Sequence, residues 1–459
     1  MTSKGRVLIV GGGVSGLATA YFLSKVGIRA TIVEKSERLG GLIHTDRVEG
    51  CDLEAGPDSY VAAKPAVTEL AKELGIGDRI IGSNDAERRI FIVRNGKLQL
   101  FPRGMVMMAP AEWGPVVRSS LFSVSTKMQF VREWFSRPRQ REGDVSIEEF
   151  VSDHFGREVL DLVTEPLLAG VYGGEAGRLS AQSVLPRFVQ YEGEYGSLIR
   201  GVRKERKITN DGSLFLSFVG GMQTFSDALQ SAIEPAPEVV RGEVSTLERQ
   251  ADSWRVLVGS DWITADEVVL ACPAHASGRI ANAIAPELGA ELSAIPYSSA
   301  ILVMLLFNGS QLEHALDGFG FLTPPSERKI LAAATFVNTK FPSRIAPGFA
   351  ALRGFLVGPQ AETLMYVPDD DLLRVIREDF QRLMGITAAP VAHTIHRWPQ
   401  SMPQYVVGHA DRYRQIRRHL HDLAGLYVTS NAFEGVGIPD CVRLAKETAN
   451  ALASRREVR

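Results

Sequence analysis

Three glycines near the N-terminus have the spacing that suits the binding of a phosphate group. Residues 7–10 are an apolar run typical of a buried parallel strand, and Gly11, Gly13 and Gly16 follow them directly. The first glycine permits a tight turn, the second lets backbone N–H groups approach a pyrophosphate, and the third allows the helix to pack closely on the strand. A helix expected over residues 15–26 would point its positive end at the phosphates.

An acidic residue and a second glycine turn extend this pattern to a whole dinucleotide. A strand is expected over residues 28–33, and Glu34 closes it where a carboxylate can accept hydrogen bonds from a ribose diol. Arg38, Gly40 and Gly41 follow, whereas a plain nicotinamide site would usually stop at the acid. The longer motif indicates a second passage of backbone past the cofactor. It therefore predicts FAD held in an extended conformation rather than a structural glycine turn.

The elements that must position this turn alternate between strand and helix over about the first 85 residues. Residues 90–93 and 97–101 flank Asn95-Gly96, which predicts a two-residue hairpin. From about residue 104 to residue 190 the pattern becomes helical. Apolar residues recur there every three or four positions and predict one helical face, formed by Trp113, Val117, Leu121, Val124, Met128, Val131 and Phe135.

Strand and helix patterns alternate again in the second half of the chain. Residues 267–272, 300–307 and 349–357 have the apolar runs of strands, and residues 370–384 and 440–453 have the pattern of helices. Strands of nucleotide-binding type thus occur at both ends of the chain and in its middle. The sequence therefore predicts discontinuous domains, with a second domain inserted into the first.

Length and composition exclude several classes of protein. The 459 residues exceed the roughly 250–300 at which one hydrophobic core stops growing, so two or three domains are expected. A formal charge of -2 gives no reason to expect a nucleic acid as partner. Residues 300–307, the longest apolar run, are too few to span a membrane, and we find no metal-ligand spacing. Cys51, Cys272 and Cys441 suit reduced thiols in the cytoplasm.

Five further segments, taken together with the glycine turns, are similar to one known family. They are Gly56-Pro57-Asp58-Ser59, residues 166–174 (PLLAGVYGG), 220–224 (GGMQT), 402–409 (MPQYVVGH) and 435–441 (GVGIPDC). The chain resembles the protoporphyrinogen/coproporphyrinogen oxidase family over nearly its whole length. These are FAD enzymes of haem biosynthesis, related to monoamine oxidases and carotene desaturases. The FAD motifs alone indicate the superfamily, whereas the segments at 166–174, 403–409 and 435–441 are specific to the family.

The resemblance implies an α/β fold. A Rossmann-like FAD-binding domain would carry an inserted mixed-sheet substrate domain and an α-helical, membrane-binding-like domain. The predicted division places the FAD-binding domain at 1–85, 191–290 and 395–459, the substrate domain at 86–103 and 291–394, and the helical domain at 104–190. The apolar stripe of the helical domain would contact a membrane, or would pack against neighbouring helices.

The resemblance also implies how FAD is held without a covalent bond. The glycine turn would contact the pyrophosphate, residues 56–59 would run beside the isoalloxazine ring, Val244 would offer backbone groups to the adenine, and Trp398 would pack near the flavin. A turn at residues 436–438 would bring N–H groups and a helix dipole to the electron-rich end of the reduced ring. The implied cofactor-binding residues are Gly11, Gly12, Gly13, Val14, Ser15, Gly16, Glu34, Lys35, Arg38, Gly40, Gly41, Leu42, Gly56, Pro57, Asp58, Ser59, Val244, Trp398, Val436, Gly437 and Ile438.

Four residues are implied to meet a tetrapyrrole substrate. Arg89 matches the arginine that pairs with a propionate, a task for which its planar fork is suited, although Arg88 beside it leaves the register open by one residue. Gly170 matches the glycine whose backbone lies near the reacting methylene, and it is the implied catalytic residue. Phe319 and Leu322 match the apolar walls of the substrate cavity, and core packing is their alternative role.

The implied reaction is the six-electron oxidation of a porphyrinogen, with O2 as acceptor and H2O2 as product. Protoporphyrinogen IX is the preferred substrate and coproporphyrinogen III the alternative within the family. The glycine turns are also compatible with an amine oxidase, a carotenoid desaturase or a non-catalytic escort protein of the same fold. A membrane surface and a second copy of the chain are candidate partners. The expected location is cytoplasmic, with peripheral attachment to the cytoplasmic membrane as the alternative.

Overall fold

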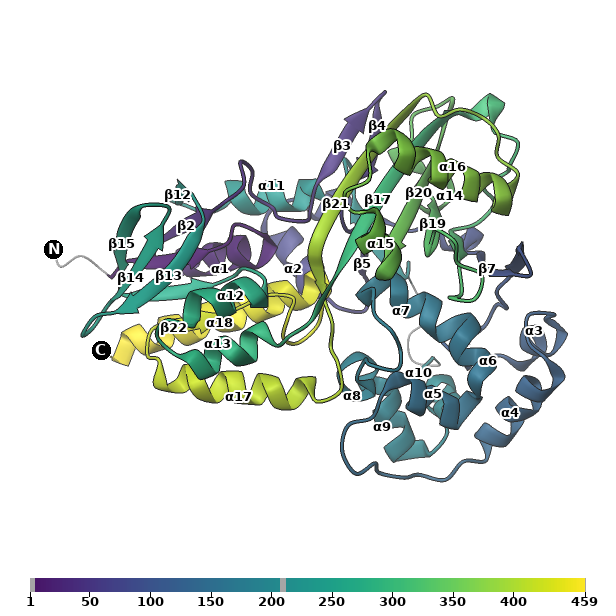
Figure 1. Cartoon of the computed structure of the whole chain (residues 1–459), viewed down its shortest axis with the longest axis horizontal. Helices are drawn as coiled ribbons and strands as arrows, with labels where there is room; N and C mark the ends of the chain where they lie inside the picture. Colours follow the sequence, from purple (N-terminus) through teal and green to yellow (C-terminus); the bar gives the residue numbers. More distant parts are fainter. Residues whose placement is uncertain (1–4, 207–211, 459) are drawn as a thin grey trace.

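A parallel sheet holds the glycine-rich turn in the computed structural model, which describes residues 5–206 and 212–458 (Figure 1). Val7 and Ile9 face one covering layer, and Leu8 and Val10 face the other, so the apolar run at residues 7–10 is buried on both sides. All pairings in this sheet are parallel, in the order β12 (Glu238–Arg241), β2 (Ala30–Glu34), β1 (Val7–Val10), β16 (Glu267–Leu270), β22 (Leu426–Val428).

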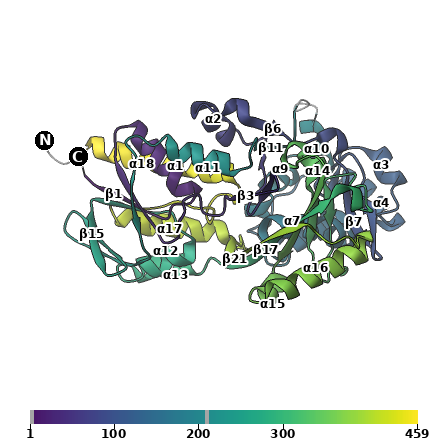
Figure 2. The same cartoon turned by 90° about the horizontal axis from the view of Figure 1, so that it is seen from above.

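Two layers cover the parallel sheet. The first contains α1 (Val14–Lys25), α2 (Ala66–Glu73), α11 (Gln223–Ser231) and α18 (Ile438–Val458). The second contains α12 (Ala274–Ala281), α13 (Pro286–Ser293), α17 (His409–Asp422) and the antiparallel strands β13 (Val244–Arg249), β14 (Trp254–Val258) and β15 (Asp261–Ala265). The first and last helices of the chain, α1 and α18, lie side by side (Figures 1 and 2).

A second body is built on a seven-stranded sheet (Figure 1). The expected hairpin is present, with Asn95 and Gly96 at positive φ between its strands. The sheet is mixed, as expected. Its strand order is β21 (Ala392–Pro403), β17 (Tyr297–Asn308), β20 (Phe349–Val357), β19 (Ala333–Phe336), β18 (Gly320–Leu322), β7 (Ile90–Arg94), β8 (Lys97–Leu100), with only the β18–β7 pair parallel. Its helices are α14 (Val337–Lys340), α15 (Pro359–Leu364) and α16 (Asp369–Met384).

The third body is helical and lies below the seven-stranded sheet in Figure 1. Its helices are α3 (Trp113–Arg118), α4 (Val124–Trp134), α5 (Ile147–Phe155), α6 (Arg157–Val159), α7 (Glu165–Tyr172), α8 (Ala181–Val184), α9 (Pro186–Tyr195) and α10 (Leu198–Arg206), with the short strands β9 (Met105–Val106) and β10 (Ala109–Pro110) beside them. A π-helical turn, Leu160–Thr164, leads into α7. Short antiparallel strands elsewhere are β3 (Thr45–Val48) with β4 (Cys51–Glu54), and β5 (Tyr60–Val61), β11 (Phe215–Phe218) and β6 (Ile80–Gly82).

The predicted helical stripe at residues 113–135 is wrong in one respect. The helix is interrupted between α3 and α4. Leu121 lies in this interruption and is buried, so the seven residues do not form one helical face. On α4 the side turned inward carries Thr126, Phe130 and Glu133. The apolar side points outward, where Val124 is 77% exposed and Phe135 is 74% exposed. Periodicity found the two helices but could not show which side has a neighbour.

The predicted domain limits at residues 190 and 394 differ from the structure. β21 continues to Pro403 within the seven-stranded sheet, beyond the expected limit at residue 394. α10 packs in the helical core through Leu198 and Ile199, beyond the expected limit at residue 190. Apart from these shifts, the division into three domains stays a prediction. Within residues 5–206 and 212–458, no helix is long and apolar enough to cross a membrane.

A buried ionic cluster joins three helices of the third body. His154 of α5 contacts Glu133 of α4 at 3.1 Å and Glu192 of α9 at 3.0 Å, and all three side chains are buried. Arg141 also bonds to Glu192, at 2.8 Å. Burial alone would lower the pKa of His154, but hydrogen bonds to Glu133 and Glu192 raise it. The folded protein therefore keeps this proton at a higher pH than the unfolded chain does.

We predict that His154→Gln removes a pH-dependent part of the stability. Because the folded pKa lies above the unfolded value of about 6.5, the stabilisation is present below that value and is lost as pH rises through the folded pKa. Thermal unfolding from pH 5.5 to pH 9 should show the largest Tm difference from wild type at the acidic end. His421→Gln, at an exposed position, is the control and should follow the wild-type curve. Parallel curves for wild type and His154→Gln would contradict the prediction.

Candidate functional site

One cavity of about 1550 Å³ lies where the three bodies meet. A pocket for one small ligand is roughly 300–1,000 Å³, so this space is large enough for more than one such molecule. All of the predicted site residues line it except Gly12, Gly16 and Arg89. The structure therefore brings together segments that lie as far apart in the chain as residues 11 and 438. Which of them contacts a ligand remains a prediction.

The glycine turn leaves an open space at the residue that should approach a phosphate. A Cβ atom on Gly13 would meet no atom nearer than 3.9 Å, so the position opens toward the cavity. Gly11 has φ +108°, and a Cβ there would stand 2.8 Å from the carbonyl oxygen of Ala271. A Cβ on Gly16 would overlap the Gly11 carbonyl. These are the turn, approach and packing roles that the spacing predicted.

Helix α1 presents an uncapped N-terminus to the same space. No side chain caps it at Gly13, and Gly13, Val14 and Ser15 line the cavity. The first N–H groups of a helix have no partner within the helix, and the helix dipole adds partial positive charge there. This end of the cavity therefore fits a pyrophosphate.

Glu34 and Arg38 order the backbone around this end. Glu34 accepts hydrogen bonds from the Gly12 N–H at 2.7 Å, the Ser36 N–H at 2.8 Å and the Ser36 hydroxyl at 2.6 Å, which leaves about one of its four acceptor sites for a ribose hydroxyl. The Arg38 guanidinium donates to the carbonyl oxygens of Leu39, Gly41 and Ile43, which holds the second glycine turn in shape. The acid thus supports the first turn and the arginine supports the second.

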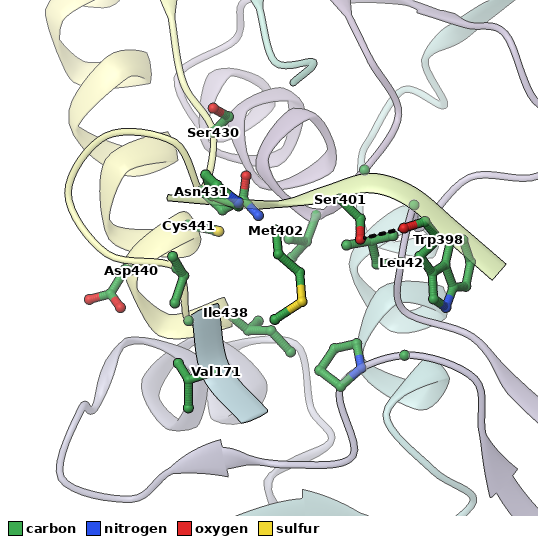
Figure 3. Close-up of a pocket in the computed structure, with 18 of the residues that line it drawn as sticks. Leu42, Val171, Trp398, Ser401, Met402, Ser430, Asn431, Ile438, Asp440 and Cys441 are labelled. Atoms are coloured by element: carbon green, nitrogen blue, oxygen red, sulfur yellow. Dashed lines mark hydrogen bonds between the residues drawn. The ribbon is translucent and has the colours of Figure 1, made fainter. Parts of the chain in front are cut away.

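Residues 436–438 bring a second helix end to the cavity, at the start of α18. Asp440, in the first turn of that helix, accepts hydrogen bonds from Lys64 at 2.8 and 2.7 Å. Figure 3 shows Met402 of β21 and Ile438 extending toward each other across this space, with Val171 of α7 beside them. Burial raises the pKa of Cys441 to about 12, so this thiol stays protonated and unreactive at neutral pH.

The other end of the cavity has mainly apolar walls. Leu167 and Gly170 of α7 face it, and a Cβ on Gly170 would meet no atom within 4 Å. Phe319 and Leu322 line it from the seven-stranded sheet. A water-poor space of this kind suits a large apolar ring.

Arg89 is placed differently from the expectation. Its guanidinium pairs with Glu87 at 2.6 Å and with Asp317 at 2.9 Å, while Arg88 pairs with Asp85 at 3.3 Å. Neither arginine is among the described residues that line the cavity, although the next residue in the chain, Ile90, does line it. To hold a propionate, Arg89 would have to give up its ion pair with either Glu87 or Asp317. The propionate-binding role therefore stays a prediction.

Sequence reasoning missed several charged residues of the cavity wall, and two of them are buried cations. Lys340 ends α14 and Arg353 lies in β20, and both are buried. Lys340 contacts Asp58 at 2.7 Å, and Arg353 contacts it at 3.5 Å. The available signal was a lone arginine inside the apolar run at residues 349–357, because a charge in a buried strand requires a partner.

Comparisons with known proteins agree with this geometry. The family model for flavin containing amine oxidoreductase matches residues 14–453. The coproporphyrinogen III oxidase of Bacillus subtilis (strain 168) is 32% identical, over 96% of this chain and 97% of that protein. The chloroplastic/mitochondrial protoporphyrinogen oxidase 2 of Arabidopsis thaliana is 25% identical, over 98% of this chain and 94% of that protein.

A solved structure also matches along its whole length. It comes from Exiguobacterium sp. 255-15, and a protoporphyrinogen oxidase function has been ascribed to it. The two chains superpose with a TM-score of 0.88 and 29% identity, covering 99% of this chain and 100% of that one. The mixed α/β arrangement with its helical body therefore recurs in a related protein.

Proposed function

Because the chain belongs to the flavin containing amine oxidoreductase family and, within it, to the porphyrinogen oxidases, we propose that it oxidises coproporphyrinogen III to coproporphyrin III with FAD as cofactor. The chain is a flavin-dependent oxidoreductase. The single observation that carries the oxidation of a porphyrinogen on FAD is the cavity of about 1550 Å³. It joins two helix N-termini, suited to phosphates and to a reduced ring, to an apolar chamber suited to a macrocycle.

The choice of substrate rests on the comparison. The family resemblance leaves both porphyrinogens open, with protoporphyrinogen IX as the preferred substrate and coproporphyrinogen III as the alternative. The coproporphyrinogen III oxidase of Bacillus subtilis matches at 32% identity and the plant protoporphyrinogen oxidase at 25%. These matches favour coproporphyrinogen III, which we adopt.

When bound, FAD supplies the acceptor for a hydride from a bridging carbon of the macrocycle. The chain supplies position and environment. The N-terminus of α1 would hold the pyrophosphate, while Leu167, Phe319 and Leu322 exclude water from the reacting face. The open backbone at Gly170 lets a bridging methylene come close. Over three rounds six electrons and six protons leave the macrocycle, and three O2 would become three H2O2.

We predict that the purified holoenzyme is yellow, releases FAD on denaturation, and oxidises coproporphyrinogen III with a higher kcat/KM than protoporphyrinogen IX. Fluorescence of the porphyrin product measures both rates, and oxidation of amines and of phytoene is assayed beside them. A preference for protoporphyrinogen IX would overturn the substrate choice. Turnover of amines or phytoene alone would favour the other oxidases of the superfamily, and a colourless, inactive protein would favour the escort role.

Gly170→Ala should lower activity without harming the fold. The added methyl group enters the cavity rather than a packed core, and alanine is about 0.5–1 kcal/mol better than glycine inside a helix. We expect an unchanged or slightly higher Tm and at least a tenfold loss of kcat/KM for coproporphyrinogen III. Gly114→Ala, in exposed α3, is the matched control and should keep wild-type kinetics. Wild-type kinetics for Gly170→Ala would show that Gly170 does not lie at the reacting carbon.

The exposed apolar side of α4 favours a membrane surface as a partner of this protein. Val124, Met128, Val131 and Phe135 are all exposed there, and Arg132 lies beside them. A helix with an apolar face and basic neighbours can bind in the plane of an anionic bilayer. The homodimer, O2 as acceptor and the cytoplasmic location stay predictions.

Replacing Val124 and Phe135 together by serine should weaken binding to vesicles that contain anionic lipid. Each side chain contributes about 1.5–3 kcal/mol when fully buried, so partial insertion of both predicts about a tenfold loss in co-sedimentation. Tyr366→Ser serves as the control, because it removes an exposed aromatic residue from the body built on the seven-stranded sheet. Equal sedimentation of wild type and the double variant would mean that this face does not meet the membrane.

A further inference from the structure

Three buried cations gather around Asp58 at the boundary between the glycine-turn body and the seven-stranded sheet. Lys340 bonds to the Asp58 carboxylate at 2.7 Å, Arg353 contacts it at 3.5 Å, and Arg344 donates to the Asp58 backbone carbonyl at 2.7 Å. Arg344 also pairs with buried Glu54 at 3.0 Å. Burial would raise the pKa of the Asp58 carboxyl, but the three cations hold it well below its usual range. Asp58 is therefore ionised at all working pH values.

Arg344 and Arg353, together with Trp398, also hold the backbone of residues 55–59 in place. The carbonyl oxygen of Ala55 accepts from the Trp398 indole at 2.7 Å, that of Gly56 from Arg353, and that of Asp58 from Arg344. In a trans peptide the next N–H points opposite to the carbonyl. The N–H groups of Gly56 and Ser59 are thus turned away from Trp398 and Arg344, and both residues line the cavity. Among the described residues neither N–H has a hydrogen-bond partner.

Lys340 and Asp58 both reach the cavity wall, and they carry opposite charges. Ser59 completes this group: its hydroxyl donates to Asp58 at 2.7 Å and lies 3.4 Å from the Lys340 ammonium. Arg353 lines the cavity beside them, whereas Arg344 does not, and both arginines border a void of about 10 Å³ that Asp52 also borders. Asp52 pairs with Arg47 at 3.7 Å and does not line the cavity, so Lys340, Arg353 and Asp58 are the charges of this cluster nearest a ligand.

We propose that this cluster is a positioning device that sets the reduction potential of the bound flavin. Lys340 and the N–H groups of Gly56 and Ser59 favour the negative charge that a flavin gains on reduction, and Asp58 opposes it. Arg344 and Trp398 thus act through the backbone N–H groups of Ser59 and Gly56, whereas Lys340, Arg353 and Asp58 act through their own charge. The inference rests on the proposed binding of FAD and is independent of which porphyrinogen is oxidised.

The direction in which the reduction potential shifts in each variant separates this role from a merely structural one. Lys340→Met removes the positive charge at the wall, so reduction of the flavin should become at least tenfold less favourable, about 30 mV for a two-electron couple. Asp58→Asn removes the negative charge and leaves Lys340 in place, so the potential should rise. Loosening of the loop would move both variants in the same direction. Arg382→Met, which removes a partner of Asp379 in α16, is the control and should keep the wild-type potential.

The measurement is an anaerobic titration of each holoenzyme against a reference dye, without any porphyrinogen, after its flavin content has been determined. Opposite shifts for Lys340→Met and Asp58→Asn support the proposal. Shifts of the same sign, or wild-type potentials at full flavin content, overturn it. If either variant fails to retain flavin, Trp398→Phe carries the test. It removes one N–H donor and no charge, and its potential should fall; a wild-type value there overturns the proposal. A wild-type protein that binds no flavin would instead refute the proposed function.

Discussion

The structure depends on places where one stretch of backbone lies against another with no side chain between them. Gly11 approaches the carbonyl of Ala271 in this way, Gly16 packs on Gly11, and a Cβ on Gly56 would overlap the carbonyl of Leu42. These approaches bring the first turn, the second turn and the 56–59 segment to the wall of the same cavity. A larger residue at Gly56 would separate the walls, whereas Gly13 keeps open the space that a phosphate requires.

The cavity lies where different kinds of surface meet. The carboxyl ends of β1 and β2 and the start of α1 provide hydrogen-bond donors, as in other nucleotide-binding sheets. The seven-stranded sheet and α7 provide apolar walls. The charged cluster around Asp58 sits between them, tying Lys340, Arg344 and Arg353 of one body to a loop of the other. One chain thus joins a polar end that suits a nucleotide to an apolar chamber.

Local patterns carried much of the prediction, because a glycine turn, a hairpin at Asn95-Gly96 and an apolar strand are encoded by neighbouring residues. The cluster could not be found in this way, since Lys340 and Asp58 are 282 positions apart and their pairing follows from the tertiary fold. Which side of α4 faces solvent could not be predicted either. Periodicity identifies an apolar stripe on a helix but does not show what packs against that stripe. The propionate role of Arg89 came from resemblance alone, and the carboxylates beside it, Glu87 and Asp317, are a property of this chain's own packing.

The order of strands in the parallel sheet has a consequence for how the protein is made. β1 and β2 are synthesised first, yet β22 closes the sheet at residues 426–428, and α18 covers α1 later still. Residues 426–428 and α18 must therefore leave the ribosome before this sheet gains its last strand and α1 its last neighbouring helix. Until then part of the apolar surface of β16 and α1 stays uncovered, and exposed apolar surface favours aggregation.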